Sequence, residues 1–317
     1  MGIRSFLSAS GARAGALLIA VMLLAAVAAT SASAGVPTAP PGSTQTTTTA
    51  SSTATETVPA AGQGPLISKL VVHAESREAA RAGAEAIEVD YDELPTVASI
   101  DAAIAPGAAK VWPDAPSNLI FDWQLGNADG AAKGIAEAHH VASLRIVQNR
   151  VAPTSMEVRA AVGEYDDADG YKLTFGGQGV AAGRPMIAGI LKTSPERVRV
   201  VTNDVGGGFG MKAFLYPEYA LVLHAARATG RPVKWTGERS DAFQTDSHGR
   251  AMVSDAKLGF DKDGMITALA VETWSDLGAY QAQFGPAIQT MAGGRIIGGV
   301  YRIPAIHNHV HGVMTNT

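Results

Sequence analysis

The sequence predicts an α+β fold in which long strands are interleaved with a few helices. Apolar or alternating runs typical of strands recur between residues 141 and 313, helical runs separate some of them, and turns rich in glycine and aspartate join others. Hydrophobic residues make up 46% of the 317 residues and aromatic residues only 6%, so the chain can build a core partly from small side chains. These three patterns together favour a mixed fold.

The first 34 residues are predicted to form a secretory signal peptide. Arg4 and Arg13 precede an apolar run at 14–29, and a small-residue site at 32–34 follows it. The run is shorter than the roughly 20 residues that span a bilayer, so a retained membrane anchor at 14–29 is the less favoured alternative. Use of the signal would make the protein periplasmic or secreted, and without it the protein would be cytoplasmic.

Residues 35–64 are predicted to form a disordered tether. The segment consists mainly of Thr, Ser, Ala and Pro, and Glu56 is its sole charge. It has too little bulky apolar surface to offset the entropy of an ordered chain.

Residues 65–135 are predicted to form a small α/β segment. Its expected elements are a strand at 66–72, a helix at 76–86 with Ser76 as N-cap, a half-buried strand at 87–91 and an irregular connection at 106–134. We place a boundary near 132–138, before a second segment at 136–317.

The second segment carries the denser pattern. Strands are expected at 141–151, 156–163, 171–175, 197–201, 233–235, 251–260, 266–275 and 306–313, and helices at 179–191 and 216–229. Gly230 and Pro232 are expected to end the second helix, and residues 166–170 and 261–264 are expected to be turns.

Composition excludes several classes of function. The 25 basic and 29 acidic residues give a net charge of −4, which argues against nucleic-acid binding. The chain has no cysteine, which rules out disulfides, thiolate zinc sites, a cysteine nucleophile and iron–sulfur clusters ligated by this chain.

A glycine cluster is the sharpest chemical feature of the sequence. Asp204-Val205-Gly206-Gly207-Gly208-Phe209-Gly210-Met211-Lys212 follows a predicted strand. Such glycines let the backbone approach a ligand and direct N–H groups at an anion. The run fits neither a P-loop nor the strict dinucleotide fingerprint. A sharp structural turn is the alternative, but a second glycine-rich strand end with Gln178 between Gly177 and Gly179 favours a preformed cofactor cradle.

At these residues the chain resembles the molybdenum hydroxylases. The order of Gly-Gly-Gln, the glycine cluster, Trp235-Thr-Gly-Glu-Arg-Ser, Asp276-Leu-Gly-Ala-Tyr and Thr315-Asn-Thr is similar to that in the molybdopterin-binding large subunits of the xanthine dehydrogenase, aldehyde oxidase and aerobic carbon monoxide dehydrogenase type. The resemblance implies the end of an α/β hammerhead domain followed by the first part of a molybdenum-cofactor-binding domain.

The resemblance also implies site residues and partners. Gln178 would lie beside the metal centre, Phe209 and Gly210 would contact the cofactor and border the substrate pocket, and Gly207 and Gly208 would let the backbone pass close by. The cofactor would be molybdopterin, in its cytosine dinucleotide form. Ala213 stands where purine-oxidising members have a glutamate, which favours an aldehyde or another small carbonyl or heterocyclic substrate.

The implied reaction is hydroxylation of a carbon with oxygen from water. Because this chain has no cysteine, electrons would pass to an iron–sulfur small subunit and an FAD-binding medium subunit. The family's arginine-containing loop and catalytic glutamate would lie beyond Thr317, so no catalytic base is assigned and an incomplete family member is expected. The alternative function is an exported fold remnant that acts as a binding module without catalysis.

His307, His309 and His311 alternate, so a strand would place all three on one face, where imidazoles can ligate zinc or copper. With no carboxylate in the motif, we favour a polar strand face and assign no metal. Glu238 and Arg239 are interpreted as a structural ion pair rather than an active-site pair.

Overall fold

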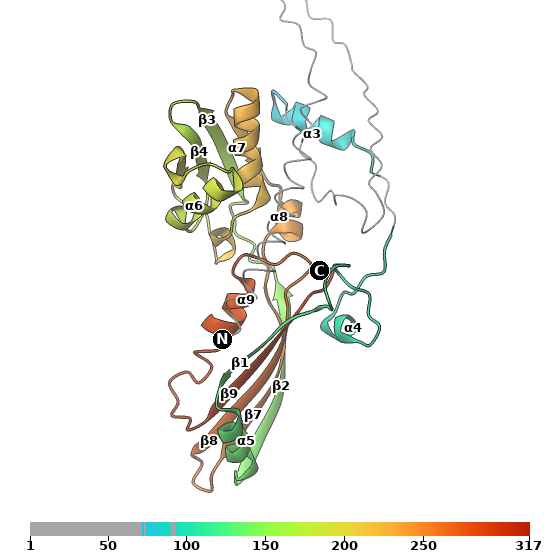
Figure 1. The fold of residues 1–317 in the computed structure, drawn as a ribbon, viewed down its shortest axis with the longest axis vertical. Helices are drawn as coiled ribbons and strands as arrows, with labels where there is room; N and C mark the ends of the chain where they lie inside the picture. The colour runs from blue at the N-terminus through green and yellow to red at the C-terminus, as the bar shows by residue number, and fades with distance from the viewer. Residues whose placement is uncertain (1–71, 73, 90–92) are drawn as a thin grey trace, which may run out of the picture. The chain divides into compact units, whose positions relative to one another are not determined.

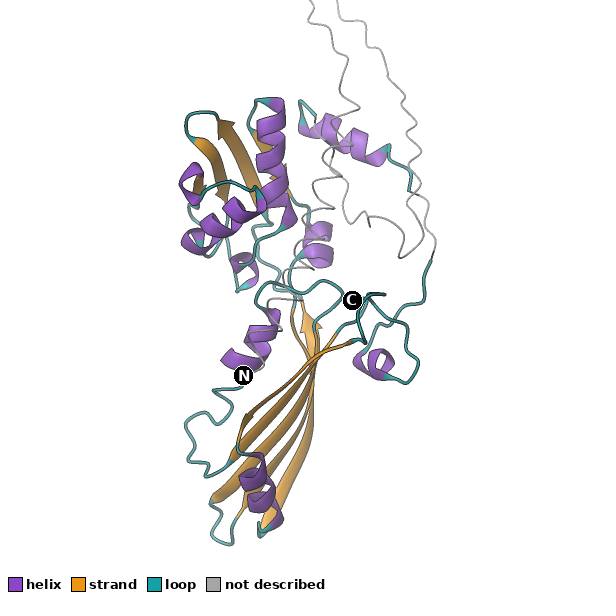
Figure 2. Cartoon of the chain, in the orientation of Figure 1, coloured by secondary structure: helices purple, strands orange, loops and turns teal. Residues whose placement is uncertain are grey.

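The chain forms two compact units (Figure 1; coloured by secondary structure in Figure 2). The computed structural model describes residue 72 and residues 74–89 and 93–317. The first unit comprises the described residues up to 89 with 159–204 and 216–236, and the second comprises 93–158, 205–215 and 237–317. Each unit combines helices with a sheet, so the α+β class is confirmed.

The first unit is built on a four-stranded sheet in the order β5-β4-β3-β6. Strand β5 runs parallel to β4, and the other neighbours are antiparallel. The elements are α3 (Arg77–Glu85), β3 (Ala160–Asp166), β4 (Gly170–Phe175), α6 (Val180–Ile190), η1 (Pro195–Arg197), β5 (Val198–Val201), α7 (Pro217–Thr229) and β6 (Val233–Thr236). The expected helices and the strands at 171–175, 197–201 and 233–235 are confirmed.

Local signals explain the ends of these elements. The Oγ atom of Ser76 accepts a hydrogen bond from the N–H of Ala79 at 3.1 Å, which caps α3 as expected. Helix α7 starts with Pro217 in its first turn and ends at Gly230, whose φ of 64° is left-handed. In the β3–β4 turn, the carboxylate of Asp166 accepts the N–H groups of Ala168 and Asp169.

Helix α7 packs very closely on β3 at Gly163. A Cβ atom on this residue would lie 2.5 Å from the carbonyl group of Val222 in α7. Because backbone cannot move aside as a flexible side chain can, Gly163→Ala is expected to destabilise the first unit by about 1–3 kcal/mol. Hydrogen exchange of the β3 and α7 amides in the full chain measures this loss.

Gly189 provides the matched control for Gly163. It lies in α6, it is exposed, and a Cβ atom there would have nothing within 4 Å. Gly189→Ala is therefore expected to be neutral or to stabilise the helix by up to about 1 kcal/mol. Equal protection in the two variants would contradict the close approach at Gly163.

The second unit is built on a five-stranded sheet in the order β1-β9-β8-β7-β2. Strands β8 and β9 are parallel, and the other neighbours are antiparallel. The elements are α4 (Ile100–Ile104), β1 (Leu119–Gly126), α5 (Ala128–Ala136), β2 (His140–Val151), η2 (Met211–Ala213), α8 (Arg239–Thr245), β7 (Gly249–Phe260), β8 (Ile266–Asp276), α9 (Gly285–Ala287), η3 (Ile288–Ala292) and β9 (Ile306–Val313). The strands expected at 141–151, 251–260, 266–275 and 306–313 are confirmed.

Hydrogen bonds stabilise the turn between β7 and β8 and the contact of α5 with β8. The carboxylate of Asp261 accepts the N–H groups of Asp263 and Met265, and Gly264 has a φ of 81°, which confirms the turn between β7 and β8. Helix α5 packs on β8, where the hydroxyl of Thr267 donates to the carbonyl of Gly134 at 2.9 Å.

Three expectations about the strands are corrected. Residues 106–134 are not an irregular connection, because they contain β1 and most of α5. Residues 87–89 form no strand and are exposed, and the strand expected at 156–163 begins only at Ala160. The segment before Ala160 instead makes the loop contacts described below.

Several predictions from the sequence are not tested by the described residues. The signal peptide at 1–34, the tether at 35–64 and nearly all of the strand at 66–72 lie outside the described residues. The division into 65–135 and 136–317 stays a prediction, and residues on both sides of 132–138 belong to the second unit. Among the described helices, none has the length and apolar character needed to cross a membrane.

Candidate functional site

The glycine cluster forms a loop of unusual backbone conformation in the second unit. Gly207 and Gly210 have φ angles of 97° and 83°, and Phe209 between them has a φ of 51°. A bulky residue is rarely left-handed, because its Cβ approaches the carbonyl oxygen, and such strain is concentrated at functional sites. The Phe209 side chain is nevertheless 72% exposed. The loop thus holds a large aromatic ring at the surface of its unit.

Glu157 anchors this loop from the segment that precedes β3. Its Oε2 atom accepts the backbone N–H of Gly206 at 2.9 Å and the ammonium of Lys212 at 2.6 Å. The backbone N–H of Glu157 donates in turn to the carbonyl of Gly206 at 3.1 Å. One carboxylate therefore ties both ends of the loop together.

Lys212 is almost completely buried, with 1% of the residue exposed, whereas the Glu157 side chain is 40% exposed. A buried ammonium needs a partner, since desolvation penalises an unpaired charge. The hydrogen bond from Lys212 is the main cause that lowers the pKa of Glu157; burial opposes it, and the N–H of Gly206 and the charge of Lys212 reinforce it.

The two glycines nearest this anchor are each required, Gly206 for lack of space and Gly207 chiefly for its positive φ. A Cβ atom at Gly206 would lie 2.6 Å from the Cβ of Glu157, and one at Gly207 would lie 2.9 Å from the Phe209 ring. At Gly210 a Cβ atom would meet nothing within 4 Å, so there glycine serves the positive φ and leaves the backbone open. The loop is close-packed at one end and open beyond Phe209.

The Glu157 anchor is expected to make stability depend on pH. Because the folded pKa lies below the unfolded value, the anchor stabilises the protein above the unfolded pKa and loses this contribution as pH falls through the folded pKa. The difference in melting temperature between the native chain and Glu157→Gln should be largest near neutral pH and should disappear as the pH falls through the lowered folded pKa of Glu157. A difference that is independent of pH would refute the ionised anchor.

Arg239 supports the same segment. Its Nη2 atom donates to the carbonyl oxygens of Ser155 and Met156 at 2.8 and 3.0 Å. The backbone N–H of Glu238 donates to the carboxylate of Asp241 at 2.7 Å at the start of α8. Arg239 therefore helps to position residues 155 and 156, a role that was not predicted from the sequence.

Gln178 belongs to the first unit, whereas Gly207, Gly208, Phe209 and Gly210 belong to the second. Gln178 is exposed and lies two residues before the start of α6. Its neighbour Gly177 is buried, and its N–H donates to the hydroxyl of Thr202 at 3.2 Å. A Cβ atom at Gly177 would collide with the Phe175 ring, so this strand end also requires glycine.

Sequence reasoning missed Glu157 and the anchoring role of Lys212. Glu157 stands 49 residues before Gly206, and no motif links the two. The one usable signal was a lysine directly after a glycine-rich run, which needs a counter-charge when it is buried.

The three histidines lie on one face of β9, as predicted. Contrary to the expectation from the motif, carboxylates face two of them: His309 contacts Asp122 at 2.8 Å, and His311 contacts Glu272 at 3.0 Å. The strand is therefore more than a solvated polar face.

Known proteins that match this chain agree with the cofactor that the glycine cluster indicated from the sequence. Residues 111–317 match the model of a family described as molybdopterin cofactor-binding domain. The gamma subunit of the 6-hydroxypseudooxynicotine dehydrogenase complex of Paenarthrobacter nicotinovorans is 32% identical over 264 residues, which cover 83% of this chain and 32% of that protein.

Solved structures give the same result. Quinoline 2-oxidoreductase from Pseudomonas putida 86 aligns with a TM-score of 0.71 at 32% identity and covers 77% of this chain and 31% of that one. Aldehyde oxidoreductase from Desulfovibrio gigas aligns with a TM-score of 0.70 at 30% identity, over 77% of this chain and 26% of that one. The chain spans about a third or less of the length of these proteins.

Proposed function

This chain belongs to the molybdenum hydroxylase large-subunit family and carries part of its molybdopterin cofactor-binding domain, and we propose that it serves as a cofactor-binding part of an oxidoreductase. The proposed substrate is an aldehyde or a similar small carbon compound. The observation that supports cofactor binding most directly is the strained loop at 206–210, which is held by Glu157 and Lys212 and leaves Phe209 exposed.

The loop fits a molybdopterin cofactor. Gly207, which has a positive φ, and its neighbour Gly208, on the resemblance of the motif, would let the backbone lie against the cofactor, while Phe209 and Gly210 would contact it from the open end of the loop. When bound, the cofactor supplies two-electron oxidation of a substrate carbon with oxygen from water. The protein's own part is to hold the loop rigid and to present an apolar ring that excludes water from the substrate.

Gln178 is proposed as a second cofactor-binding residue, on the resemblance of its motif. Its amide can both donate and accept a hydrogen bond, which suits an oxygen ligand whose protonation changes. Gly177 beside it is buried, and a side chain there would collide with the Phe175 ring. The cytosine dinucleotide form of the cofactor stays a proposal of the same kind.

The substrate proposal rests on residue 213. Ala213 is exposed and offers no charge or hydrogen bond, so it cannot select a purine as a glutamate would. The named substrates of two similar proteins, an aldehyde and quinoline, are both small and lack the purine ring system. We therefore favour aldehydes, with small heterocycles as the next class.

Electron transfer is proposed to need partner subunits. The chain has no cysteine to ligate an iron–sulfur cluster. The similar dehydrogenase from Paenarthrobacter is named as one subunit of a complex. We propose an iron–sulfur small subunit and an FAD-binding medium subunit as partners, and export to the periplasm or beyond if the signal at 1–34 is used.

The test is the metal and pterin content of the chain co-expressed with its partner subunits. One molybdenum and one pterin per chain is the expected result, and aldehyde-dependent reduction of an artificial electron acceptor is expected when a segment with the family's catalytic glutamate is supplied as well. A folded complex without either would overturn the proposal and favour a binding module without catalysis. A loaded complex that oxidises purines but no aldehyde would overturn the substrate class alone.

A further inference from the structure

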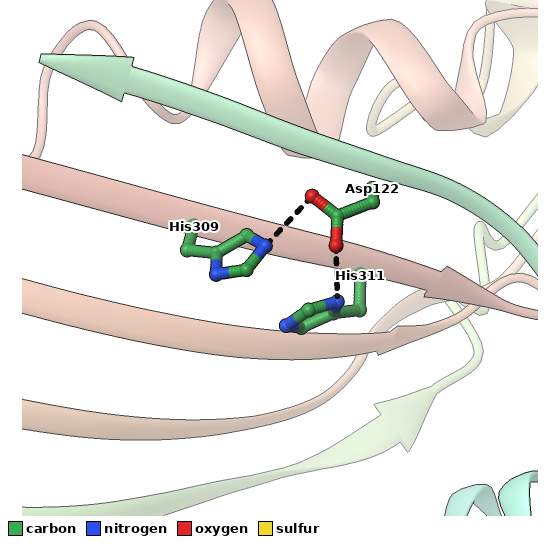
Figure 3. Close-up of side chains that lie close together, drawn as sticks. All are labelled: Asp122, His309 and His311. Carbon is green, nitrogen blue, oxygen red and sulfur yellow. Dashed lines mark hydrogen bonds and ion pairs between the residues drawn. The ribbon is translucent and has the colours of Figure 1, made fainter.

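Asp122, His309 and His311 converge on one face of the five-stranded sheet (Figure 3). The antiparallel register of β1 and β9 places Asp122 opposite His311. The Oδ1 atom of Asp122 lies 2.8 Å from Nε2 of His309, and its Oδ2 atom lies 3.4 Å from Nδ1 of His311. One carboxylate thus faces a ring nitrogen of each histidine.

His311 is the most constrained member of this cluster. Its side chain is 7% exposed, and its Nδ1 atom is buried without a hydrogen bond. Trp274 stacks on the imidazole with ring centroids 4.0 Å apart and an interplanar angle of 17°. The ring therefore cannot turn toward water to satisfy Nδ1.

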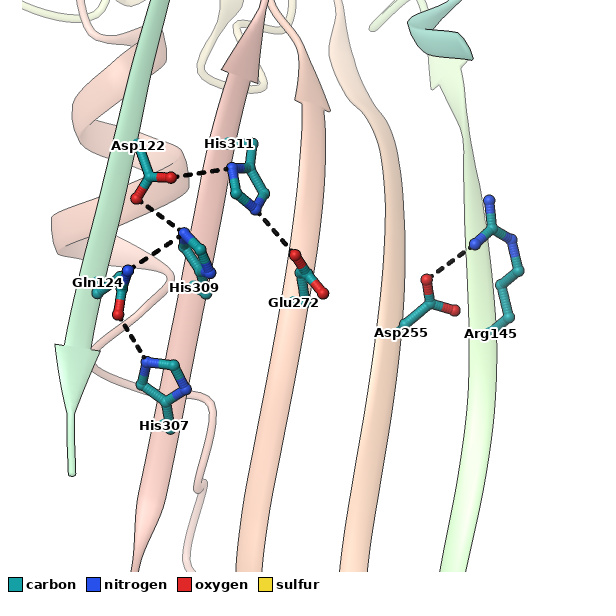
Figure 4. A network of polar contacts seen from close by, with 8 residues as sticks. All are labelled: Asp122, Gln124, Arg145, Asp255, Glu272, His307, His309 and His311. Carbon is teal, nitrogen blue, oxygen red and sulfur yellow. Dashed lines mark hydrogen bonds and ion pairs between the residues drawn. The ribbon is translucent and has the colours of Figure 1, made fainter. Parts of the chain in front are cut away.

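Glu272 determines which nitrogen of His311 carries the proton. Nε2 lies 3.0 Å from Oε1 of Glu272, and a carboxylate accepts hydrogen bonds (Figure 4). In the neutral imidazole Nε2 is then the donor, and Nδ1 presents its lone pair to Asp122. Two electron-rich atoms, Nδ1 and Oδ2, consequently face each other at 3.4 Å in a buried position, an arrangement that a cation between them would stabilise.

A carboxylate that supports a metal-bound histidine from behind is a recurrent feature of metal sites. Another carboxylate, Asp255, pairs with Arg145 at 2.8 Å (Figure 4). It is therefore not available to bind a metal or to support a metal-bound histidine. His307 contacts Gln124 at 3.1 Å and lies outside the group of three. Asp122, His309 and His311 are therefore the candidate direct ligands, and the surrounding polar residues are not.

We propose that Asp122, His309 Nε2 and His311 Nδ1 bind one divalent transition-metal ion, with Zn²⁺ as the test ion. The candidate ligand atoms all lie within 4.8 Å of one another. Zinc bonds of roughly 2.0–2.2 Å need only small side-chain movements to bring these atoms around one ion. Imidazole and carboxylate ligands suit such ions, and three protein ligands leave a fourth position for water. The ion would join β1 to β9.

The test uses the untagged full chain and needs no molybdenum. Titration with Co²⁺ is expected to give the intense visible absorption of a four-coordinate ion at one equivalent per chain, and Zn²⁺ should displace it. Asp122→Asn and His309→Gln should each weaken binding at least tenfold, and Glu272→Gln should weaken it by about 10- to 100-fold by freeing the His311 ring.

His307→Gln and Asp255→Asn are the matched controls, since they alter the same polar face but not the three ligands. Both should bind Co²⁺ within twofold of the native chain. Equal weakening in the controls and the ligand variants would overturn the proposal. So would the absence of stoichiometric binding, which would mean that a proton on His311 fills the contact with Asp122. Thermal unfolding without metal shows whether each variant is folded.

Discussion

Replacing Arg159 with methionine is expected to destabilise the first unit by about 3–5 kcal/mol. The Nη1 atom of Arg159 lies 2.9 Å from Oε2 of Glu218, and the two side chains are only 2% and 4% exposed. The guanidinium also lies over the Tyr216 ring, with 3.7 Å from Cζ to the centroid. Methionine fills much of the volume but leaves the carboxylate of Glu218 buried without its cation, which is the costly outcome.

Hydrogen exchange of the β3 and α7 amides in the full chain measures this effect for the first unit alone. At about 1.4 kcal/mol per tenfold, protection should fall by about a hundredfold or more. The double variant Arg159→Met/Glu218→Met should recover most of the loss, since no charge remains buried.

Arg145→Met is the surface control for the buried pair. Arg145 lies 2.8 Å from Asp255, but the two side chains are 58% and 49% exposed. This substitution should cost less than about 1 kcal/mol in the second unit. If Arg159→Met costs no more than Arg145→Met, the buried pair is not important for the stability of the first unit.

Replacing Lys212 with methionine is expected to lower the molybdenum content of the purified complex by about 10- to 100-fold. The substitution removes a charge-assisted hydrogen bond to Glu157, a contact of about 1.5–3 kcal/mol, and so frees one end of the glycine loop. Glu157 is 40% exposed and can be solvated by water, so the fold should survive while the loop loses its rigidity. Molybdenum and pterin analysis of the folded complex measures the effect.

Lys172→Met is the matched control for Lys212→Met. Lys172 pairs with Glu164 at 2.7 Å, but both side chains are well exposed, and the pair joins β3 and β4 in the other unit. Its removal should leave cofactor content unchanged. Glu157→Gln should also lower the cofactor content, and it should cost more stability than Lys212→Met because it leaves the buried Lys212 ammonium without a counter-charge. Full molybdenum content in both loop variants would show that the anchor has no part in cofactor binding.

The elements that sequence predicted correctly are those with local signals. The end of helix α7 was predicted from Gly230 and Pro232, and the β7–β8 turn from the run between Asp261 and Gly264. These signals act within a few residues, so periodicity and capping chemistry are sufficient to detect them.

What the sequence did not reveal depends on partners far along the chain. Strand β1 lies among prolines and glycines and becomes a strand because it pairs with β9. The same pairing brings Asp122 to His309 and His311, so the carboxylate absent from the histidine motif was invisible without the register. The anchor between Glu157 and Gly206 is likewise non-local.

The position of β9 between β1 and β8 in the sheet has a consequence for the order in which the protein folds. Strands β1 and β8 have β9 as a common neighbour, and residues 127–305 are synthesised between β1 and β9. The four strands of the first unit are complete by residue 236. This unit can therefore fold while β1 still lacks its partner strand β9 and has unpaired backbone groups. During synthesis the second unit is therefore the later and more aggregation-prone of the two, and its sheet closes only when β9 has left the ribosome.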